Sequence, residues 1–234
     1  MPGMAARANA GASDTPTEPV RQLVVVGASA GGVEALTTLV STLPPDFAAP
    51  IVVAQHVSPS RVSHLAEILA PRSVLQVRNV IDREMLGRGV IYVVPADRNV
   101  EITGHEVRVT GDTNRGRPKP SIDRLLDTAA TSFGENLIAV ILTGTGSDGA
   151  DGARHVKHAG DTIVIQNPQT ASHPEMPLSL TPTTVDIVAE LPAIGTLLHD
   201  LLSGTYAPSR PEDDRRLRGL LDQLRARSGI DFNG

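Results

Sequence analysis

The sequence contains no cysteine, which excludes disulfide bonds, thiolate metal sites and cysteine nucleophiles. It has no tryptophan, and aromatic residues make up only 2% of its 234 residues, so its core must be built from aliphatic side chains. Positive charge is not in excess either, because the formal net charge is −5. No basic stretch interleaved with aromatic residues occurs, which argues against a nucleic-acid partner.

Long apolar runs are also missing. No segment approaches the roughly 20 residues that span a bilayer, so we expect no membrane insertion. Residues 1–20 are rich in Ala, Gly, Pro and Thr, and they lack the continuous apolar stretch of a secretory signal. These features predict a cytoplasmic protein whose residues 1–20 form a flexible N-terminal tail.

What the sequence does contain is an alternation of short β-branched runs and helical stretches, starting at Gln22. The β-branched runs are continuously apolar, as in parallel strands that are buried on both faces. These predicted strands cover residues 23–26, 51–54, 90–94, 137–142 and 162–165. The predicted helices cover residues 31–41, 60–70, 121–132 and 149–159. The alternation predicts an α/β fold, a doubly wound three-layer αβα sandwich around a mostly parallel sheet.

Two further segments complete the predicted organisation. Residues 100–109 (VEITGHEVRV) alternate polar and apolar residues about a Gly-His turn, which predicts an antiparallel hairpin inserted in the sheet. We assign residues 21–203 to one folded domain. Residues 204–234 begin Pro-rich and charged, and their leucine spacing predicts one C-terminal amphipathic helix after a linker. These leucines are Leu217, Leu220, Leu221 and Leu224.

Candidate functional residues follow three of the predicted strands. In an open α/β sheet, working residues lie beyond the carboxyl ends of the strands. Ser29 follows strand 23–26, His56 follows strand 51–54, and Asp148 lies in the TGTGSDG segment after strand 137–142. The separation of Ser29 and His56 is about one βαβ step, so their strands should be neighbours. A nucleophile, a general base and an acid that orients the base need these residue types.

The stretch QLVVVGASAGGVEAL around Ser29 allows more than one interpretation. GASAG fits the G-x-S-x-G elbow that exposes a nucleophilic serine, and the N–H of Ala30 would then help to hold an oxyanion. A dinucleotide site would need an acidic residue after the second strand, where Gln55 and His56 stand instead. A P-loop would need a GK[ST] sequence, which does not follow. Taken alone, His56 could be structural, and Asp148 could cap helix 149–159.

Other titratable residues are weaker candidates. His155 and His158 are three positions apart on one predicted helix, but no third metal ligand is evident, so we favour a solvated face. We expect His64 on a helix surface and His105 in a turn. The remaining candidate acids are expected at helix starts or surface turns: Asp123, Asp151 and Asp161.

Several motifs together resemble the catalytic domain of the chemotaxis protein-glutamate methylesterases (CheB type). They run from about Gln22 to Leu198 and include VVVGASAGGVEAL, VVAQHVSPS, VIYVVPADRNV, RGRPKPSIDRLLDTAA, VILTGTGSDGADGARHVKHAGDTIVIQNPQTA and MPLSLTPTTVDIV. The resemblance places the nucleophile, histidine and aspartate of the family on Ser29, His56 and Asp148. It also places three residues at the oxyanion or substrate site: Ala30, Thr145 and Gly146. No cofactor or metal is implied.

The resemblance implies hydrolysis of glutamyl methyl esters on a methylated chemoreceptor-like signalling protein, and also glutamine deamidation by some family members. Three positions depart from the family pattern: Ala30 replaces Thr, Thr145 replaces Met, and Glu175 replaces Gly. These departures motivate an alternative, a catalytically weak regulatory or binding module of the same fold. A nucleotide-binding α/β domain is a third interpretation.

Two features of the ends of the chain bear on its organisation. Family members usually carry an N-terminal receiver domain, and the 20 residues of the predicted tail are too few to form one. The C-terminal LRARSGIDFNG resembles the opening of the N-terminal subdomain of chemotaxis receptor methyltransferases. It raises the hypothesis of a fused or associated methyltransferase.

Overall fold

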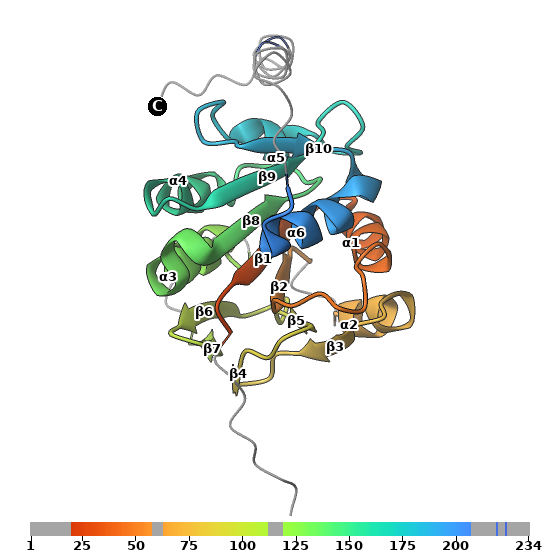
Figure 1. The fold of residues 1–234 in the computed structure, drawn as a ribbon, viewed down its shortest axis with the longest axis vertical. Coiled ribbons are helices and arrows are strands. Elements are labelled where there is room, and N and C mark those ends of the chain that lie inside the picture. Colours follow the sequence, from red (N-terminus) through yellow and green to blue (C-terminus); the bar gives the residue numbers. More distant parts are fainter. Residues whose placement is uncertain (1–19, 58–62, 112–118, 207–218, 220–222, 224–234) are drawn as a thin grey trace, which may run out of the picture.

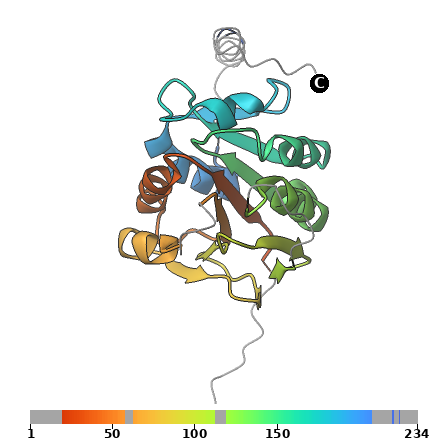
Figure 2. The same ribbon diagram turned by 180° about the vertical axis from the view of Figure 1, so that it is seen from behind.

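The computed structural model describes residues 20–57, 63–111 and 119–206, together with Gly219 and Gln223. A central sheet separates two layers of helices, as Figures 1 and 2 show from opposite sides. One layer contains α1 (Gly32–Ser41), α2 (Leu65–Leu69) and α6 (Ile194–Ser203), and the other contains α3 (Ile122–Phe133) and α4 (Ala150–His158). The predicted doubly wound three-layer αβα architecture is confirmed.

The central sheet has seven strands in the order β10-β9-β8-β1-β2-β5-β3, and every neighbouring pair is parallel. From β1 the chain builds one side of the sheet, then returns to β8 on the other side of β1. The strand order therefore reverses at β1, where the carboxyl ends of β1, β2 and β8 meet. The strands are β1 (Leu23–Ala28), β2 (Ile51–Gln55), β3 (Gln76–Asn79), β5 (Val90–Val93), β8 (Leu137–Ile141), β9 (Thr162–Gln166) and β10 (Ile187–Ala189).

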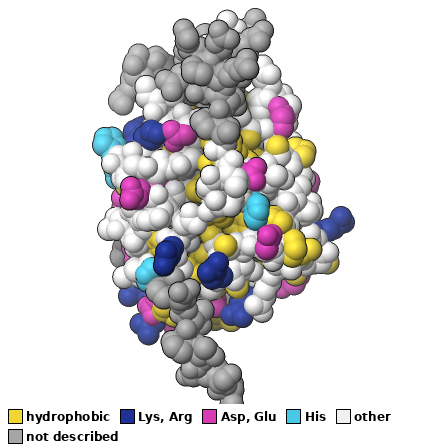
Figure 3. Space-filling view, in the orientation of Figure 1, with side chains coloured by type: hydrophobic (Ala, Val, Ile, Leu, Met, Phe, Trp, Pro, Cys, Tyr) yellow, Lys and Arg dark blue, Asp and Glu magenta, His cyan; other side chains and the backbone are white. Residues whose placement is uncertain are grey.

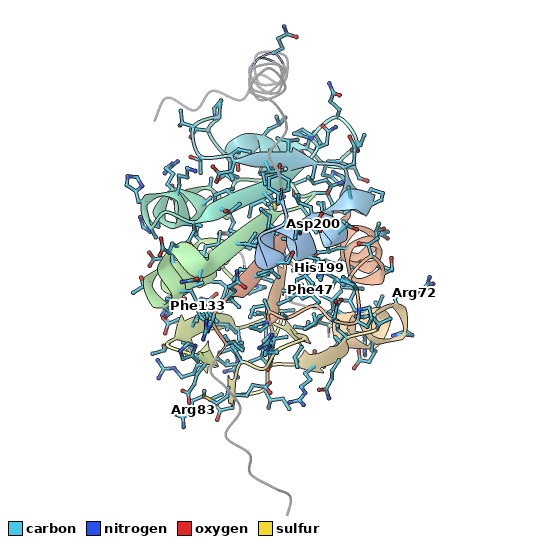
Figure 4. All side chains as sticks on the ribbon, viewed as in Figure 1. Phe47, Arg72, Arg83, Phe133, His199 and Asp200 are labelled. Carbon is cyan, nitrogen blue, oxygen red and sulfur yellow. The ribbon has the colours of Figure 1, made fainter. Side chains whose placement is uncertain are left out.

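The two faces of the sheet bury different side chains of each strand. Val25, Val52 and Ala54 belong to the core cluster that contains α3 and α4. Val24 and Val26 belong to the cluster that contains α1 and α2. Alternate side chains of a strand point to opposite faces, so the continuously apolar strands β1 and β2 fill both cores. Two of the three phenylalanines of the chain add to these aliphatic cores, with Phe47 2% and Phe133 7% exposed (Figure 4).

The predicted hairpin over residues 100–109 forms from β6 (Asn99–Thr103) and β7 (Glu106–Thr110). It is not inserted in the central sheet. Instead, it pairs with β4 (Arg83–Met85) in a separate three-stranded antiparallel sheet, with the order β4-β7-β6. The second sheet forms because the hairpin lays one apolar face against α3. Its buried residues on that face are Val100, Ile102 and Val107.

Several elements differ from the sequence prediction. The helix expected over residues 60–70 is observed as α2, which begins at Leu65 and continues as a 3-10 turn (Ala70–Arg72) that contains Pro71. The start of the predicted range falls within residues 58–62, which lie outside the described residues. The edge strands β3 and β10 and the five-residue helix α5 (Glu175–Ser179) are not among the elements that the sequence predicts, because such short segments give no clear periodic pattern. Two further 3-10 turns cover Gly134–Asn136 and Leu191–Ala193.

The ends of the chain are largely outside the described residues. They include nearly all of the predicted tail over 1–20 and most of the predicted segment over 204–234. Within the part of the chain that the structure describes, no helix has the length and apolar character needed to cross a membrane. On the molecular face in Figure 3, acidic and basic side chains are interspersed, and they form no continuous basic surface.

Asp161 is a buried carboxylate just before β9, and it predicts a pH-dependent stability. Its Oδ1 accepts a hydrogen bond from Leu137 N–H at 2.9 Å, whereas its Oδ2 has no partner among the described residues. Burial raises the pKa of Asp161 from 3.8 to about 6. The native state therefore favours the protonated carboxyl. The contribution of Asp161 to stability is full below its unfolded pKa and is lost as the pH rises through about 6.

We therefore expect Asp161→Asn to raise the free energy of unfolding at pH 8 by up to about 3 kcal/mol. The amide retains the acceptor for Leu137 N–H and carries no charge. Urea unfolding of both proteins at pH 5 and pH 8 checks the prediction, because the advantage of the variant should grow with pH. A variant that is no more stable than the parent at pH 8 would contradict it.

Candidate active site

The carboxyl ends of β1 and β2 place Ser29 and His56 on adjacent strands. Ala28 and Gln55 are partners in the β1–β2 register. Ser29 and His56 are the residues that directly follow them, one after each strand. The His56 N–H donates to Ala28 O at 3.0 Å, which extends the pairing by one residue. On the other side of β1, the Ser29 N–H donates to Thr143 O at 3.0 Å and attaches the serine to the end of β8.

Side-chain alternation puts both residues on the α3 side of the sheet. Val25 and Ala54 face α3, and Ser29 and His56 lie four and two positions further along their strands. The first residue of α3 lies directly over β1. A Cβ atom on Gly27 would be only 2.7 Å from Ile122 Cγ2. The absence of a side chain at Gly27 lets the start of α3 approach the site.

His56 and Asp148 form the central contact of the site. His56 Nε2 lies 2.8 Å from Asp148 Oδ2, and both side chains are 13% exposed. The same Oδ2 accepts from the Ile122 N–H at 2.8 Å, and Oδ1 accepts from the Asp123 N–H at 3.0 Å. The carboxylate therefore binds the N-terminus of α3, where negative charge is favoured.

These contacts determine the charge state of Asp148. Burial raises its pKa, but the hydrogen bonds from His56 and from the backbone N–H groups of Asp123 and Ile122 outweigh burial. The net pKa lies below its usual value of 3.8. Asp148 is therefore a stable anion that can orient the imidazole ring of His56 and stabilise its protonated form.

Asp123 holds the loop that carries Asp148. Asp123 Oδ1 accepts from the N–H groups of Gly149 and Gly152, each at 2.8 Å. Burial, and to a smaller extent the negative charge of Asp148, raise the pKa of Asp123 to about 6. They outweigh the two hydrogen bonds, which lower this pKa. The alternative interpretation of Asp148 as the cap of α4 is wrong, because its carboxylate binds α3 while Asp123 binds the start of α4. The expected place of Asp123 at a helix start is confirmed.

Ser29 begins a tight turn between β1 and α1. The Gly32 N–H donates to Ser29 O at 2.8 Å. Gly31 has φ 74° and ψ 1°, the values of the third residue of a type II β-turn, a position that strongly favours glycine. Among the described residues only glycines have positive φ, so Ser29 itself is not in the left-handed region. The turn thus differs from the strained elbow that the GASAG sequence suggests.

Several backbone N–H groups around Ser29 are free to bind an anion. The N–H groups of Ala30 and Gly31 donate to no other described residue, and the same holds for those of Thr145 and Gly146. Thr145 and Gly146 are exposed, and Gly146 has φ 85°. Within the described residues, Ser29 Oγ likewise makes no hydrogen bond, including to His56.

Gly144 lies between Ser29 and the start of α5. Its N–H donates to His173 O, and its O accepts from the Met176 N–H, both at 2.9 Å. A Cβ atom on Gly144 would lie 2.8 Å from Ser29 Cβ and would also overlap the Met176 side chain. Glu175, one of the three residues that depart from the family pattern, is the first residue of α5. Its Oε2 is buried, and it has no hydrogen-bond partner among the described residues.

We expect Gly144→Ala to lower hydrolytic activity by about 10- to 100-fold through displacement of Ser29, because small misplacements of reacting groups have effects of this size. The methyl group meets Ser29 Cβ, which the backbone of the turn fixes. Steady-state rates of ester hydrolysis check the prediction. Gly111→Ala is a suitable control, because a Cβ atom there meets no neighbour within 4 Å. Equal activities of the two variants would contradict the prediction.

The remaining histidine candidates lie away from the site. His155 is exposed and its Nδ1 lies 2.6 Å from Asp127 Oδ1, and exposed His158 contacts the Arg154 carbonyl. Within the described ranges, no three His, Asp or Glu side chains form a potential metal site. His64 is exposed at the start of α2, and His105 lies in the β6–β7 turn, as expected.

The sequence patterns did not single out three residues that shape the site. In the sequence, Gln55 stands out only because it is not acidic, and Thr143 and Gly144 are only two residues of the TGTGSDG segment. Their roles come from contacts between strands that are distant in sequence. Two of these contacts are from Gln55 to Ser29 O at 2.7 Å and from Thr143 Oγ1 to Ala30 O at 3.1 Å.

A doubly wound sheet that carries serine, histidine and aspartate at its switch point has the residue set of a serine hydrolase. Comparison with known proteins gives a more specific assignment. The sequence profile described as CheB methylesterase matches residues 24–198, so the chain belongs to the CheB methylesterase family. This finding confirms the resemblance found in the sequence.

A solved structure and two curated relatives agree with this family. The crystal structure of the Thermotoga maritima CheB methylesterase catalytic domain superposes with a TM-score of 0.72 and 34% identity, covering 77% of this chain and 98% of that chain. "Protein-glutamate methylesterase/protein-glutamine glutaminase 1" from Saccharophagus degradans is 37% identical over 160 residues, 65% of this chain and 44% of the relative. The Thermotoga maritima enzyme with the same double activity in its name is 35% identical, covering 68% of this chain.

The chain spans less than half the length of these two curated relatives, 44% and 47% respectively. A relative from Leptospira interrogans is 35% identical over 178 residues and is matched over 92% of its length. The profile match covers residues 24–198, and the Thermotoga maritima catalytic-domain structure is matched over 98% of its length.

Proposed function

We propose that this chain hydrolyses glutamyl methyl esters on a chemoreceptor-like signalling protein, with Ser29 as nucleophile, His56 as general base and Asp148 as the orienting acid. The observation that carries the proposal is the 2.8 Å contact between His56 Nε2 and Asp148 Oδ2 beside the Ser29 turn. The names of the family members support the reaction type.

The hydrogen bonds of the site define how the proton moves. His56 Nε2–H donates to Asp148, which leaves Nδ1 unprotonated and able to act as the base. Nδ1 takes the proton of Ser29 as Oγ attacks the ester carbonyl, and the protonated imidazole then gives this proton to the departing methoxide, which leaves as methanol. Water, deprotonated by the same imidazole, hydrolyses the glutamyl-enzyme and releases the free carboxylate and Ser29. The Ser29–His56 hydrogen bond is expected to form in the substrate complex, because catalytic hydrogen bonds are often long in free enzymes.

The negative charge on the ester oxygen needs hydrogen-bond donors. The N–H of Ala30 directly follows the nucleophile and is free among the described residues. The N–H groups of Thr145 and Gly146, on the loop that leads to Asp148, are the second set of donors. Each such donor contributes roughly 10²- to 10³-fold to the rate in enzymes of this kind.

The same site supports glutamine deamidation. Attack of Ser29 on a primary amide gives the same glutamyl-enzyme, with ammonia instead of methanol as the leaving group. The names of the relatives include glutaminase activity. Glu175 directly precedes Met176, which packs beside Gly144, and its Oε2 is buried without a hydrogen-bond partner among the described residues. Of the three residues that depart from the family pattern, Glu175 is therefore the one most able to alter substrate choice. The cytoplasmic location, the domain boundaries and the methyltransferase partner stay predictions.

Two measurements test the proposed reaction. The first is methanol release from a chemoreceptor fragment that has been methylated in vitro, followed by mass spectrometry of its glutamyl peptides. The second is labelling with a fluorophosphonate probe, which we expect to modify Ser29. A folded protein that releases little methanol and takes up little probe would support the alternative, a catalytically weak regulatory or binding module of the same fold. The missing Ser29–His56 hydrogen bond is the observation that favours this alternative.

A further inference from the structure

Gln55 is a buried polar residue that connects the two catalytic strand ends. It is the last residue of β2 and is 5% exposed. Its Nε2 donates to Ser29 O at 2.7 Å and to His56 O at 2.9 Å. An amide nitrogen has two hydrogen atoms, so both donations are made at once. One side chain thereby holds the backbone carbonyls of the proposed nucleophile and the proposed base.

The contact with Ser29 O determines the direction of the next backbone N–H. In a trans peptide, the C=O and N–H groups point in opposite directions. The Ser29–Ala30 peptide has its carbonyl fixed by two donors, Gln55 Nε2 at 2.7 Å and Gly32 N at 2.8 Å. The Ala30 N–H must therefore point away from Gln55. This N–H is the donor that directly follows the nucleophile.

The structure accommodates the Gln55 amide at some cost. A Cβ atom on Gly32 would overlap Gln55 Oε1, so only glycine leaves room for this side chain. Gln55 Oε1 is buried, and it has no hydrogen-bond partner among the described residues. An orphaned buried polar atom costs about 1–3 kcal/mol. The amide is nevertheless held with its nitrogen toward the two carbonyl oxygens, because these two acceptors require a donor.

We propose that Gln55 is a positioning residue, which aims the Ala30 N–H at the developing oxyanion and keeps Ser29 and His56 in register. This inference rests on the proposed function of Ser29. It assigns to Gln55 an effect on the transition state and little effect on substrate binding, since an oxyanion exists only after attack has begun.

The test compares the Gln55→Met and Gln55→Glu variants with the parent chain, and methylated receptor fragment is the substrate. Methionine has a similar shape and donates no hydrogen bond. We expect Gln55→Met to lower kcat by about 10- to 100-fold and to change KM less than about threefold. The expected kcat loss is smaller than the roughly 10²- to 10³-fold loss that follows removal of a whole oxyanion donor. A kcat within twofold of the parent in the folded variant would overturn the proposal.

Gln55→Glu adds a readout that a purely structural role would not change. A carboxylate places two acceptors against two carbonyl oxygens, whereas the protonated acid can donate one hydrogen bond. The activity of Gln55→Glu relative to the parent should therefore rise as the pH falls from 8 to 5.5. A constant ratio across this range would overturn the donor role of Gln55, and this arm remains decisive if Gln55→Met does not fold.

Two controls separate the possible causes of a loss. Thr184→Val removes a buried hydroxyl that hydrogen bonds to Thr181 Oγ1 at 2.7 Å. Thr184 lies just before the amino end of β10, whereas the site lies at the carboxyl ends of β1, β2 and β8. The Thr184→Val variant should be destabilised in urea but keep kcat, so a similar kcat loss in this variant would assign the Gln55 effect to stability. If Ser29→Ala keeps its activity, the proposed function fails. If Ser29→Ala is inactive and Gln55→Met is fully active, only the positioning role fails.

Discussion

Replacing Ser29 with alanine is expected to lower the rate of methanol release by about 10⁴- to 10⁶-fold, the range found when a triad nucleophile is removed. The chemistry gives the reason, because the proposed nucleophile directly follows β1, next to the strand that carries His56. The fold should be unaffected. Ser29 Oγ makes no hydrogen bond with the described residues, so the free energy of unfolding should change by less than about 0.5 kcal/mol. Single-turnover assays with methylated receptor fragment and urea unfolding measure the two quantities.

A nearby serine provides the matched control. Ser172 is exposed and lies close to the same turn, with its Cβ 3.3 Å from the position of a Cβ on Gly31. Ser172→Ala should keep its rate within about threefold of the parent and should still bind the fluorophosphonate probe, whereas Ser29→Ala should not bind it. Methanol release by Ser29→Ala at the parent rate would remove Ser29 from the mechanism.

The local sequence predicted most of the elements around the site. The runs LVVV, IVVA and LIAVIL have the continuous apolar character of strands buried on both faces, and they form β1, β2 and β8 with ends within two residues of the prediction. Glycines mark the turn after β1, because glycine adopts the φ of 74° found at Gly31 without steric cost. These features depend on short segments, and short segments are what sequence patterns describe.

Contacts between distant segments could not be read in the same way. The pattern placed His56 and Asp148 at one edge of the sheet, but the binding of Asp148 to the start of α3 depends on where α3 crosses β1. That crossing depends on Gly27, whose missing side chain admits Ile122. In the same way, Gln55 gains its contacts only after β1 and β2 pair with Ala28 opposite Gln55. The hairpin was predicted, but its partner β4 is an exposed three-residue strand with no apolar run.

The proposed site is therefore held by three side chains from two strand ends, those of β2 and β8. Gln55 holds the nucleophile turn, Thr143 Oγ1 holds the Ala30 carbonyl, and Asp148 holds His56 against α3. Preorganised donors of this kind cost no rearrangement during the reaction. The arrangement predicts that Asp148 affects both the chemistry and the stability of the domain, which its replacement can separate.

Asp148→Asn is expected to lower the rate by about 10²- to 10⁴-fold. The carboxylate of Asp148 accepts from three donors: His56 Nε2 at 2.8 Å, Ile122 N at 2.8 Å and Asp123 N at 3.0 Å. An asparagine amide has only one acceptor oxygen, so at least one of these donors must face its NH₂ group. In either amide orientation, the negative charge that stabilises the protonated imidazole is lost. The mispaired donor should also lower the free energy of unfolding by about 1–3 kcal/mol.

The pH dependence separates the two roles of Asp148. Because its native pKa lies below 3.8, its contribution to stability is full above about pH 4 and fades as the pH falls toward the native pKa. The difference in unfolding free energy between parent and Asp148→Asn should therefore shrink as the pH falls below about 4. Asp151→Asn makes the same chemical change three residues away at an exposed position and should alter neither rate nor stability appreciably. Asp148→Asn with the parent rate and the predicted loss of stability would show that Asp148 only caps α3, because a group that orients the base cannot lose its charge without slowing the reaction.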